Sequence, residues 1–215
     1  MAYTTINKST DYFNTKLYNG TGSNQSITGV GFKPDWIWGK TRSSGQRHVL
    51  TDVVRGINKQ LASDSTAAET SYTNSFTAFG SDGFSVGTDN GTNMASQTQV
   101  AWNWLAGTAV SGNTGGSGSY KTYTGSVNTT SGFSIIKYTG NGSGGHTIPH
   151  HLSSIPKMII MKRTDGGTDA WQVYHQSLGN TKRLTLQTTA AADADINYFN
   201  NTTPTSSVFT LGSSS

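Results

Sequence analysis

The sequence predicts an all-β protein, and its composition supports that class in three ways. Of its 215 residues, 102 are Ser, Thr, Gly or Asn, which are short and uncharged and favour turns. The chain has one glutamate, Glu69, and few leucines, so residues that favour long helices are scarce. Its 22 aromatic residues are too many for a disordered chain and, with Thr, Val and Ile, favour pleated sheets. We therefore expect short strands joined by Gly-rich turns.

The first half of the chain holds several predicted strands. Trp36–Trp38 is a short apolar run behind a proline, which suits a central strand covered on both faces. Phe76–Phe79 and Phe84–Val86 flank the turn signal Gly80–Gly83, which predicts a strand, a turn and a strand. Val100–Leu105 predicts a last strand with both of its tryptophans on one face.

An internal repeat relates the two halves of the chain. The matched segments keep their order while the offset grows from 120 to 125, as in a duplicated module with loop insertions. The matched pairs are Phe13–Gly22 with Phe133–Gly142, Gly31–Lys40 with Ser153–Lys162, Lys59–Ala68 with Lys182–Ala191, and Phe84–Gly87 with Phe209–Gly212. The apolar run Met158–Met161 is therefore predicted to be a second central strand, equivalent to Trp36–Trp38.

The repeat predicts tandem antiparallel β-sandwich modules. Module 1 is expected over residues 1–107 and module 2 over residues 119–215, joined by a flexible Gly/Ser/Thr linker over residues 108–118. Module 2 lacks a counterpart of Val100–Leu105, so its sandwich is expected to have an unpaired edge. We expect either that the chain is a portion of a longer protein or that another segment fills this place.

Composition and charge exclude several classes of protein. The absence of cysteine excludes disulfides, zinc-thiolate sites and cysteine nucleophiles. The 15 Lys and Arg and the 11 Asp and Glu are scattered singly, without the basic run of a nucleic-acid-binding protein. The N-terminus has no apolar signal region, and nowhere do 18 apolar residues run together. We expect synthesis in a cytoplasm and no membrane insertion.

No residue pattern indicates an enzyme. Hydrolysis of a glycan needs two carboxylates, but Glu69 lies in a stretch that resembles a loop, and most aspartates adjoin turn-forming residues. The sequence also lacks a nucleophile elbow and a phosphate-binding loop. The protein is therefore expected to be non-catalytic.

Metal ligands are also sparse, and no cofactor is expected. His146–His151 contains three imidazoles without a cysteine or a nearby glutamate to complete a site, so it is predicted to be a polar loop. Calcium is the alternative, although no twelve-residue calcium-binding loop is present. Its candidate ligands are Asp193 and Asp195 with Asn197, or Asp82 with Asp89.

Two loops at equivalent places in the repeat have the composition of a sugar-binding site. Lys40–His48 and Lys162–Trp171 mix charged and short polar side chains, and the second ends in an aromatic ring that could stack on a sugar. The candidate ligand-binding residues are Arg42, Arg47, His48, Arg163, Asp165, Asp169 and Trp171. The alternative for Trp171, as for Tyr174, is a core position in the next strand.

The repeat also carries a family resemblance over nearly the whole chain. The segments concerned are Ser9–Arg42, Asp52–Gly56 (DVVRG), Ser81–Asn93 (SDGFSVGTDNGTN), Val100–Gly107 (VAWNWLAG) and Ser131–Thr164. They resemble a repeated domain of uncharacterised function in virion and tail-fibre-like proteins of marine bacteriophages, related to concanavalin A-like lectin or jelly-roll sandwiches. Segments like VAWNWLAG close a module in that family, and the second copy departs from the pattern because it has none.

The resemblance implies a bacteriophage structural protein on the particle surface, in a tail fibre or another appendage. Its expected partners are other virion proteins, further copies of itself, and a glycan of the host surface. Three functions stay open: a lectin-like module that binds such a glycan, a capsid decoration or fibre protein that makes only protein contacts, and a glycan depolymerase. The resemblance supplies no catalytic motif for the last of these.

Overall fold

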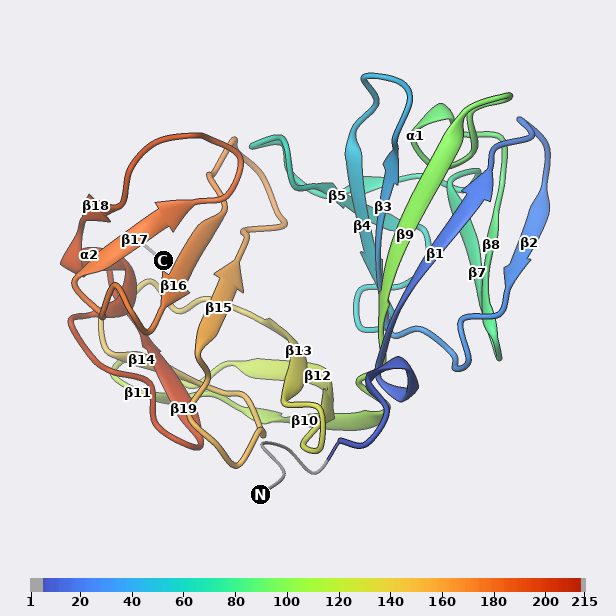
Figure 1. Ribbon diagram of the computed structural model, residues 1–215. Helices are drawn as coiled ribbons and strands as arrows, with labels where there is room; N and C mark the ends of the chain where they lie inside the picture. Colours follow the sequence, from blue (N-terminus) through green and yellow to red (C-terminus); the bar gives the residue numbers. More distant parts are fainter. Residues whose placement is uncertain (1–5, 214–215) are drawn as a thin grey trace. The chain divides into compact units, whose positions relative to one another are not determined.

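The computed structural model describes residues 6–213, and strands dominate this part of the chain (Figure 1). The all-β class is confirmed, because every strand pair is antiparallel and the helical segments are short. These segments are the 3₁₀ turn η1 (Ser9–Asp11) and the helices α1 (Asn90–Asn93) and α2 (Ile196–Phe199). None of the helices in this part of the chain has the length and apolar character to cross a bilayer.

The described chain divides into two compact units. Unit 1 comprises the chain up to Gly107 together with Thr164–Thr168, and unit 2 comprises Thr108–Arg163 and the chain from Asp169 onward.

Unit 1 contains two antiparallel sheets. The larger sheet has six strands in the order β1-β9-β3-β4-β5-β6, and the smaller has three in the order β2-β8-β7. Each strand predicted in the first half of the chain overlaps an observed one. The strands are β1 (Phe13–Asn19), β2 (Gln25–Thr28), β3 (Trp36–Thr41), β4 (His48–Asp52), β5 (Lys59–Ala62), β6 (Thr70–Ser71), β7 (Phe76–Gly80), β8 (Gly83–Val86) and β9 (Thr98–Trp104).

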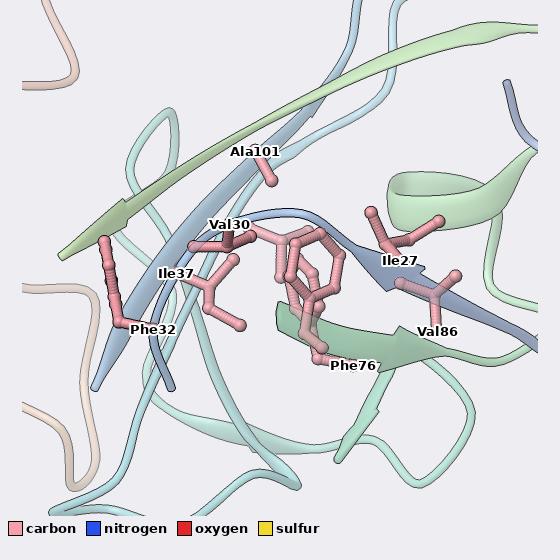
Figure 2. Packing of buried hydrophobic residues seen from close by; sticks show 9 residues of the cluster. Ile27, Val30, Phe32, Ile37, Phe76, Val86 and Ala101 are labelled. Carbon is pink, nitrogen blue, oxygen red and sulfur yellow. The ribbon is translucent and has the colours of Figure 1, made fainter. Parts of the chain in front are cut away.

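The hydrophobic core of unit 1 combines side chains from both sheets (Figure 2). Ile37 and Ala101 contribute from the larger sheet, and Phe76 and Phe84 from the smaller one; all four are at most 2% exposed. Strand β3 is central, as predicted, because it pairs with both β9 and β4. The expectation that both of its faces are covered is wrong, since Trp36 and Trp38 on the opposite face from Ile37 are only half-buried.

Unit 2 contains three antiparallel sheets. Their strand orders are β10-β12-β13, β11-β14-β19 and β15-β16-β17-β18. The core cluster includes Ile148 and Leu211 from the second sheet, Met161 and Tyr174 from the third, and Phe199 of α2. The strands are β10 (Thr108–Asn113), β11 (Gly115–Gly116), β12 (Thr122–Asn128), β13 (Phe133–Tyr138), β14 (His146–Pro149), β15 (Met158–Met161), β16 (Gln172–His175), β17 (Lys182–Thr185), β18 (Asp193–Ala194) and β19 (Val208–Leu211).

The segment predicted as a linker, residues 108–118, is instead largely extended strand. Thr108–Asn113 forms β10 and pairs with β12 over its whole length, and Gly115–Gly116 pairs with β14. Its short polar residues suit an exposed edge strand, and Gly112 leaves room for the ring of Tyr123. A Cβ atom at Gly112 would lie 2.9 Å from the Tyr123 hydroxyl oxygen. Local composition suggested flexibility, but pairing with a neighbouring strand determines the conformation.

The repeat in the sequence corresponds to a repeat in strand order. β15-β16-β17-β18 reproduces β3-β4-β5-β6, β14-β19 reproduces β2-β8, and β13 occupies the sequence position of β1. The prediction that Met158–Met161 is a central strand is wrong within the described chain, because β15 ends its sheet. In unit 1 the equivalent strand β3 is central because β9 pairs with its second edge.

Candidate functional site

The most distinctive surface of unit 1 is a group of aromatic rings on the outer face of its six-stranded sheet. Successive side chains of a strand point to opposite faces, so the rings lie opposite the core residues Ile37 and Ala101. They come from three adjacent strands: β1, β9 and β3. We call this surface the aromatic face; its residues are Phe13, Trp36, Trp38, Trp102 and Trp104.

The rings of the aromatic face form a continuous series. The Trp36 ring stacks on the rings of Trp104 and Trp38, with centroids 4.9 and 6.1 Å apart. Phe13 lies 4.7 Å from Trp104, and Trp102 makes an edge contact with Trp38 at 6.1 Å. Phe13 is 36% exposed and the four tryptophans are half-buried, so the face combines fixed ring positions with accessible apolar surface.

Strand register places a polar groove at the other end of the same strands. Phe13 pairs with Trp104 at one end of β1 and β9, whereas Asn19 pairs with Thr98 at the other. Leu17, Asn19, Arg42 and Thr98 line a groove of about 260 Å³ there. The Arg42 backbone N–H donates to the Thr98 carbonyl oxygen at 2.7 Å, which fixes the residue while its side chain stays exposed. Stacking surface and hydrogen-bonding groups thus lie along one sheet.

The internal repeat shows that the aromatic face is not shared by the two units. Trp36 and Trp38 on β3 correspond to Met158 and Ile160 on β15. The copies share the proline and the apolar character of this strand, which the scaffold needs, but unit 2 has no tryptophan at these positions. The rings are therefore specific to unit 1, where β9 pairs with β3.

Three predicted ligand-binding residues lie around the β3–β4 loop of unit 1. Arg42 and Arg47 are exposed, and half-buried His48 is the first residue of β4. The His48 backbone N–H donates to Asp64 Oδ1 at 2.9 Å. Inside the loop the Lys40 ammonium donates to the carbonyl oxygens of Ser44 and Gln46, at 3.3 and 2.9 Å. Internal hydrogen bonds therefore stabilise the loop, and its two arginine side chains are exposed.

The other predicted residues lie on the β15–β16 connection. Arg163, Asp165 and Asp169 are exposed, and the Arg163 guanidinium lies 3.5 Å from the Asp169 carboxylate. Trp171 is only 4% exposed, which fits the alternative of a core residue and leaves its ring no surface on which to stack a sugar. The same holds for Tyr174, which belongs to the core cluster of unit 2.

Sequence reasoning overlooked the aromatic face because Trp36–Trp38 resembles a fully buried strand. Tryptophan counts as apolar in such a pattern, although its ring often lies at a surface. The signal that could have revealed the face is the replacement of both tryptophans in the second copy by Met158 and Ile160.

The first part of the histidine segment of unit 2, His146–Pro149, is the strand β14, and His150 and His151 follow it outside any strand, so the predicted polar loop is only partly correct. His146 belongs to β14 and is 1% exposed, with its Nε2 atom 2.6 Å from the Thr114 hydroxyl. His150 is 4% exposed; its Nδ1 accepts from the Leu152 N–H, so its Nε2–H donates to the Thr205 carbonyl oxygen at 3.2 Å. Within residues 6–213 no group of three or more His, Cys, Asp or Glu side chains is placed to hold a metal ion.

Acidification is expected to destabilise unit 2 through these two histidines. Burial lowers the pKa of His146 and of His150 below the ordinary value of 6.5. As pH falls through 6.5, the unfolded chain takes up protons that the folded imidazoles do not, so the free energy of unfolding decreases. Urea unfolding at pH 7.5 and pH 5.5 measures this loss, which should be smaller in His146→Gln. An equal loss in the variant would contradict the prediction.

The aspartates considered for calcium have structural partners. Asp82 accepts from the backbone N–H groups of Gly31 and Gly29 at 2.6 and 2.9 Å, and these hydrogen bonds lower its pKa. Asp89 and Asp195 each accept from a backbone N–H in the first turn of α1 and α2, respectively. The Asp193 carboxylate lies 3.2 Å from the Arg183 guanidinium. Each of these carboxylates therefore has a role in turns, caps or ion pairs.

Comparison with known proteins identifies the family but no function. A family model described as a domain of unknown function (DUF7483) matches residues 8–215, a range that includes both units. No curated protein and no solved structure matches the chain.

Proposed function

The chain belongs to the DUF7483 family, and we propose that it is a non-catalytic carbohydrate-binding protein whose unit 1 holds a sugar chain on the aromatic face. The observation that carries the proposal is the continuous series of five rings on one accessible side of the sheet. Pyranose rings have apolar C–H faces that stack on aromatic side chains, while their hydroxyl groups need hydrogen-bond partners. The rings supply the first requirement, and Arg42 and Thr98 in the groove at the other end of the same strands supply the second.

Exposed apolar area of this kind also needs an explanation in terms of binding. Removing large aromatic side chains from water lowers the free energy, so a contiguous accessible group of them marks an interaction surface. In unit 1 the exposed side chains of Phe13 and Leu17, at 36% and 58%, extend the surface along β1. A sugar chain lying across the strands would cover several rings at once.

The proposal includes the wider setting that the family resemblance implies. The units would be lectin-like, concanavalin A-type sandwiches displayed on a bacteriophage appendage, and the glycan would belong to the host surface. Labelling phage particles with gold-conjugated antibody against the chain tests the location. Label on a tail or fibre is the expected result, and unlabelled particles that infect normally would contradict it.

Replacing Trp36 is expected to abolish most of the binding. Trp36 stands in the middle of the series, so Trp36→Ala removes one stacking surface and loosens Trp104 and Trp38 on either side. Loss of a central tryptophan typically weakens binding by roughly tenfold or more. The measurement is calorimetric titration with neutral glucan, galactan and mannan oligosaccharides, chosen after a glycan array, with thermal unfolding to confirm that the variant folds.

The repeat and a conservative change provide matched controls. Met158→Ala alters the equivalent strand position in unit 2 and should leave affinity unchanged, as should Tyr120→Ala, which removes an aromatic ring that is 68% exposed and outside the aromatic face. Trp36→Phe should retain part of the affinity because it keeps a ring. No binding at millimolar sugar, with or without calcium, would overturn the proposal and favour a protein that makes only protein contacts.

A further inference from the structure

Two strands of unit 2 each have an unpaired edge in the described chain. Their counterparts in unit 1 are bridged by a third strand. β9 pairs with β1 on one side and with β3 on the other. The counterparts β13 and β15 each end a separate sheet, and no strand of the described chain pairs with both (Figure 1). The two strands still contribute to one core cluster, through Ile136 and Tyr138 on β13 and Ile159 and Met161 on β15. We call β13 (Phe133–Tyr138) and β15 (Met158–Met161) the edge pair.

Burial differs between the units at the place where β9 lies. Ile37 of β3 is fully buried and packs in a cluster with Ala101 of β9, whereas its counterpart Ile159 is only half-buried. Met158, the counterpart of Trp36, is 51% exposed, and Ile155 just before it is 47% exposed. Apolar surface is thus left accessible at β15 of unit 2, whereas β9 covers the equivalent strand β3 in unit 1.

A buried polar atom lies at the same place. The Ser134 hydroxyl on β13 is buried without a hydrogen-bond partner in the described chain. Its counterpart in the repeat is Asn14, which faces Asn103 of β9 in the strand register. The Asn103 side-chain amide donates to the Asn14 carbonyl oxygen at 3.1 Å. That hydrogen bond reaches the Asn14 backbone, while the Asn14 side chain donates to the Val30 carbonyl oxygen at 2.8 Å. Leaving a buried polar group unpaired is costly, and a polar side chain on an incoming strand would give the Ser134 hydroxyl a partner.

We propose that unit 2 binds an extended segment of a separate polypeptide as one antiparallel strand paired with both members of the edge pair. Such strand addition satisfies the backbone groups of both edges and buries the apolar side chains beside them. The inference depends on unit 2 alone and does not depend on carbohydrate binding by unit 1.

The sequence of β9 specifies the chemistry of the incoming segment. Its core-facing side chains, Gln99, Ala101 and Asn103, are small or carry amides and are completely buried. Its outward side chains include Trp102 and Trp104, which pack on the tryptophans of β3. The partner should therefore alternate small or amide residues with large apolar ones over about seven residues. The chain's own β9 is unsuitable because both of its edges are already paired.

A synthetic peptide with the sequence of residues 98–107 tests the proposal on the 215-residue chain. The expected results are saturable binding by calorimetry and new protection from hydrogen exchange in 133–138 and 158–161. A peptide carrying Ala101→Pro, which cannot complete the strand pairing, should bind at least about tenfold more weakly. Because only the peptide changes, misfolding of the protein cannot explain that difference.

A pair of protein variants tests the location. Met158→Glu puts a charge on the exposed edge of unit 2 and should weaken binding by about tenfold or more, whereas Leu17→Glu on β1, at a similarly exposed position, should change it less than about twofold. No binding at 1 mM peptide would overturn the proposal. So would protection confined to β1 or β10, or self-association of the chain that protects the edge pair without any peptide.

Discussion

Replacing Arg55 by alanine is expected to lower the free energy of unfolding by about 3 kcal/mol, because it breaks a largely buried group of ion pairs. The Arg55 side chain is 7% exposed and donates from Nε to Asp52 Oδ2 at 2.5 Å and from Nη1 to Glu69 Oε2 at 3.1 Å. It also donates to the Leu50 carbonyl oxygen at 3.3 Å. Without the guanidinium, two carboxylates with side chains 6% and 15% exposed lose their main counter-charge.

Lys59→Ala is the matched control for the Arg55 substitution. The Lys59 ammonium lies 3.8 Å from the same Glu69 carboxylate, but its side chain is 45% exposed. Exposed pairs contribute about 1 kcal/mol or less, so the variant should unfold at nearly the same urea concentration as the wild type. Circular dichroism during urea unfolding measures both changes. Equal losses in the two variants would show that burial of Arg55 has no special importance.

Phe76→Ala is expected to destabilise unit 1 by about 3 to 5 kcal/mol, since it empties a fully buried position. The Phe76 ring makes an edge contact with Phe84, with centroids 5.4 Å apart, and lies directly against Gly39 of β3. A Cβ atom at Gly39 would be 2.7 Å from the Phe76 ring, so the glycine and the ring fit together. Because Gly39 adjoins Trp38, the substitution should also loosen the aromatic face.

Phe79→Ala on the same strand is the comparison for Phe76. Phe79 is only partly buried against the core, so its loss should be clearly smaller than that of Phe76. Urea unfolding followed by tryptophan fluorescence reports on the sheet that carries the tryptophans. A Phe76→Ala variant as stable as Phe79→Ala would mean that the core collapses around the missing ring.

Local patterns predicted four of the nine strands described in unit 1. Phe84–Val86 and Val100–Leu105 overlap β8 and β9, and the two-residue loop between β7 and β8 falls at the predicted turn. These elements could be predicted because apolar side chains alternate within them and Gly and Asp mark their ends. The tryptophans of β9 lie on one face, as the period of two residues requires.

The errors occurred where neighbouring strands determine the structure. Residues 108–118 have the composition of a linker, yet the backbone of β12 pairs with most of them. His146 is polar in sequence but becomes a buried strand residue because Thr114 provides a hydrogen bond. The aromatic face depends on register between strands far apart in the chain, which places Phe13 beside Trp104. No short window of sequence contains that information.

The pairing of β1 with β9 has a consequence for how unit 1 is made. Phe13 pairs with Trp104, so the two strands are about 90 residues apart in the chain. During synthesis β1 leaves the ribosome long before β9, its one neighbour in the sheet among residues 6–213, exists, and closing so long a loop slows folding. Until β9 emerges, the side chains of Trp36 and Ile37 on β3 also lack their cover on that side. Unit 1 should therefore complete its fold in one late step, and β3, whose apolar side chains wait for the cover that β9 provides, would benefit most from a chaperone.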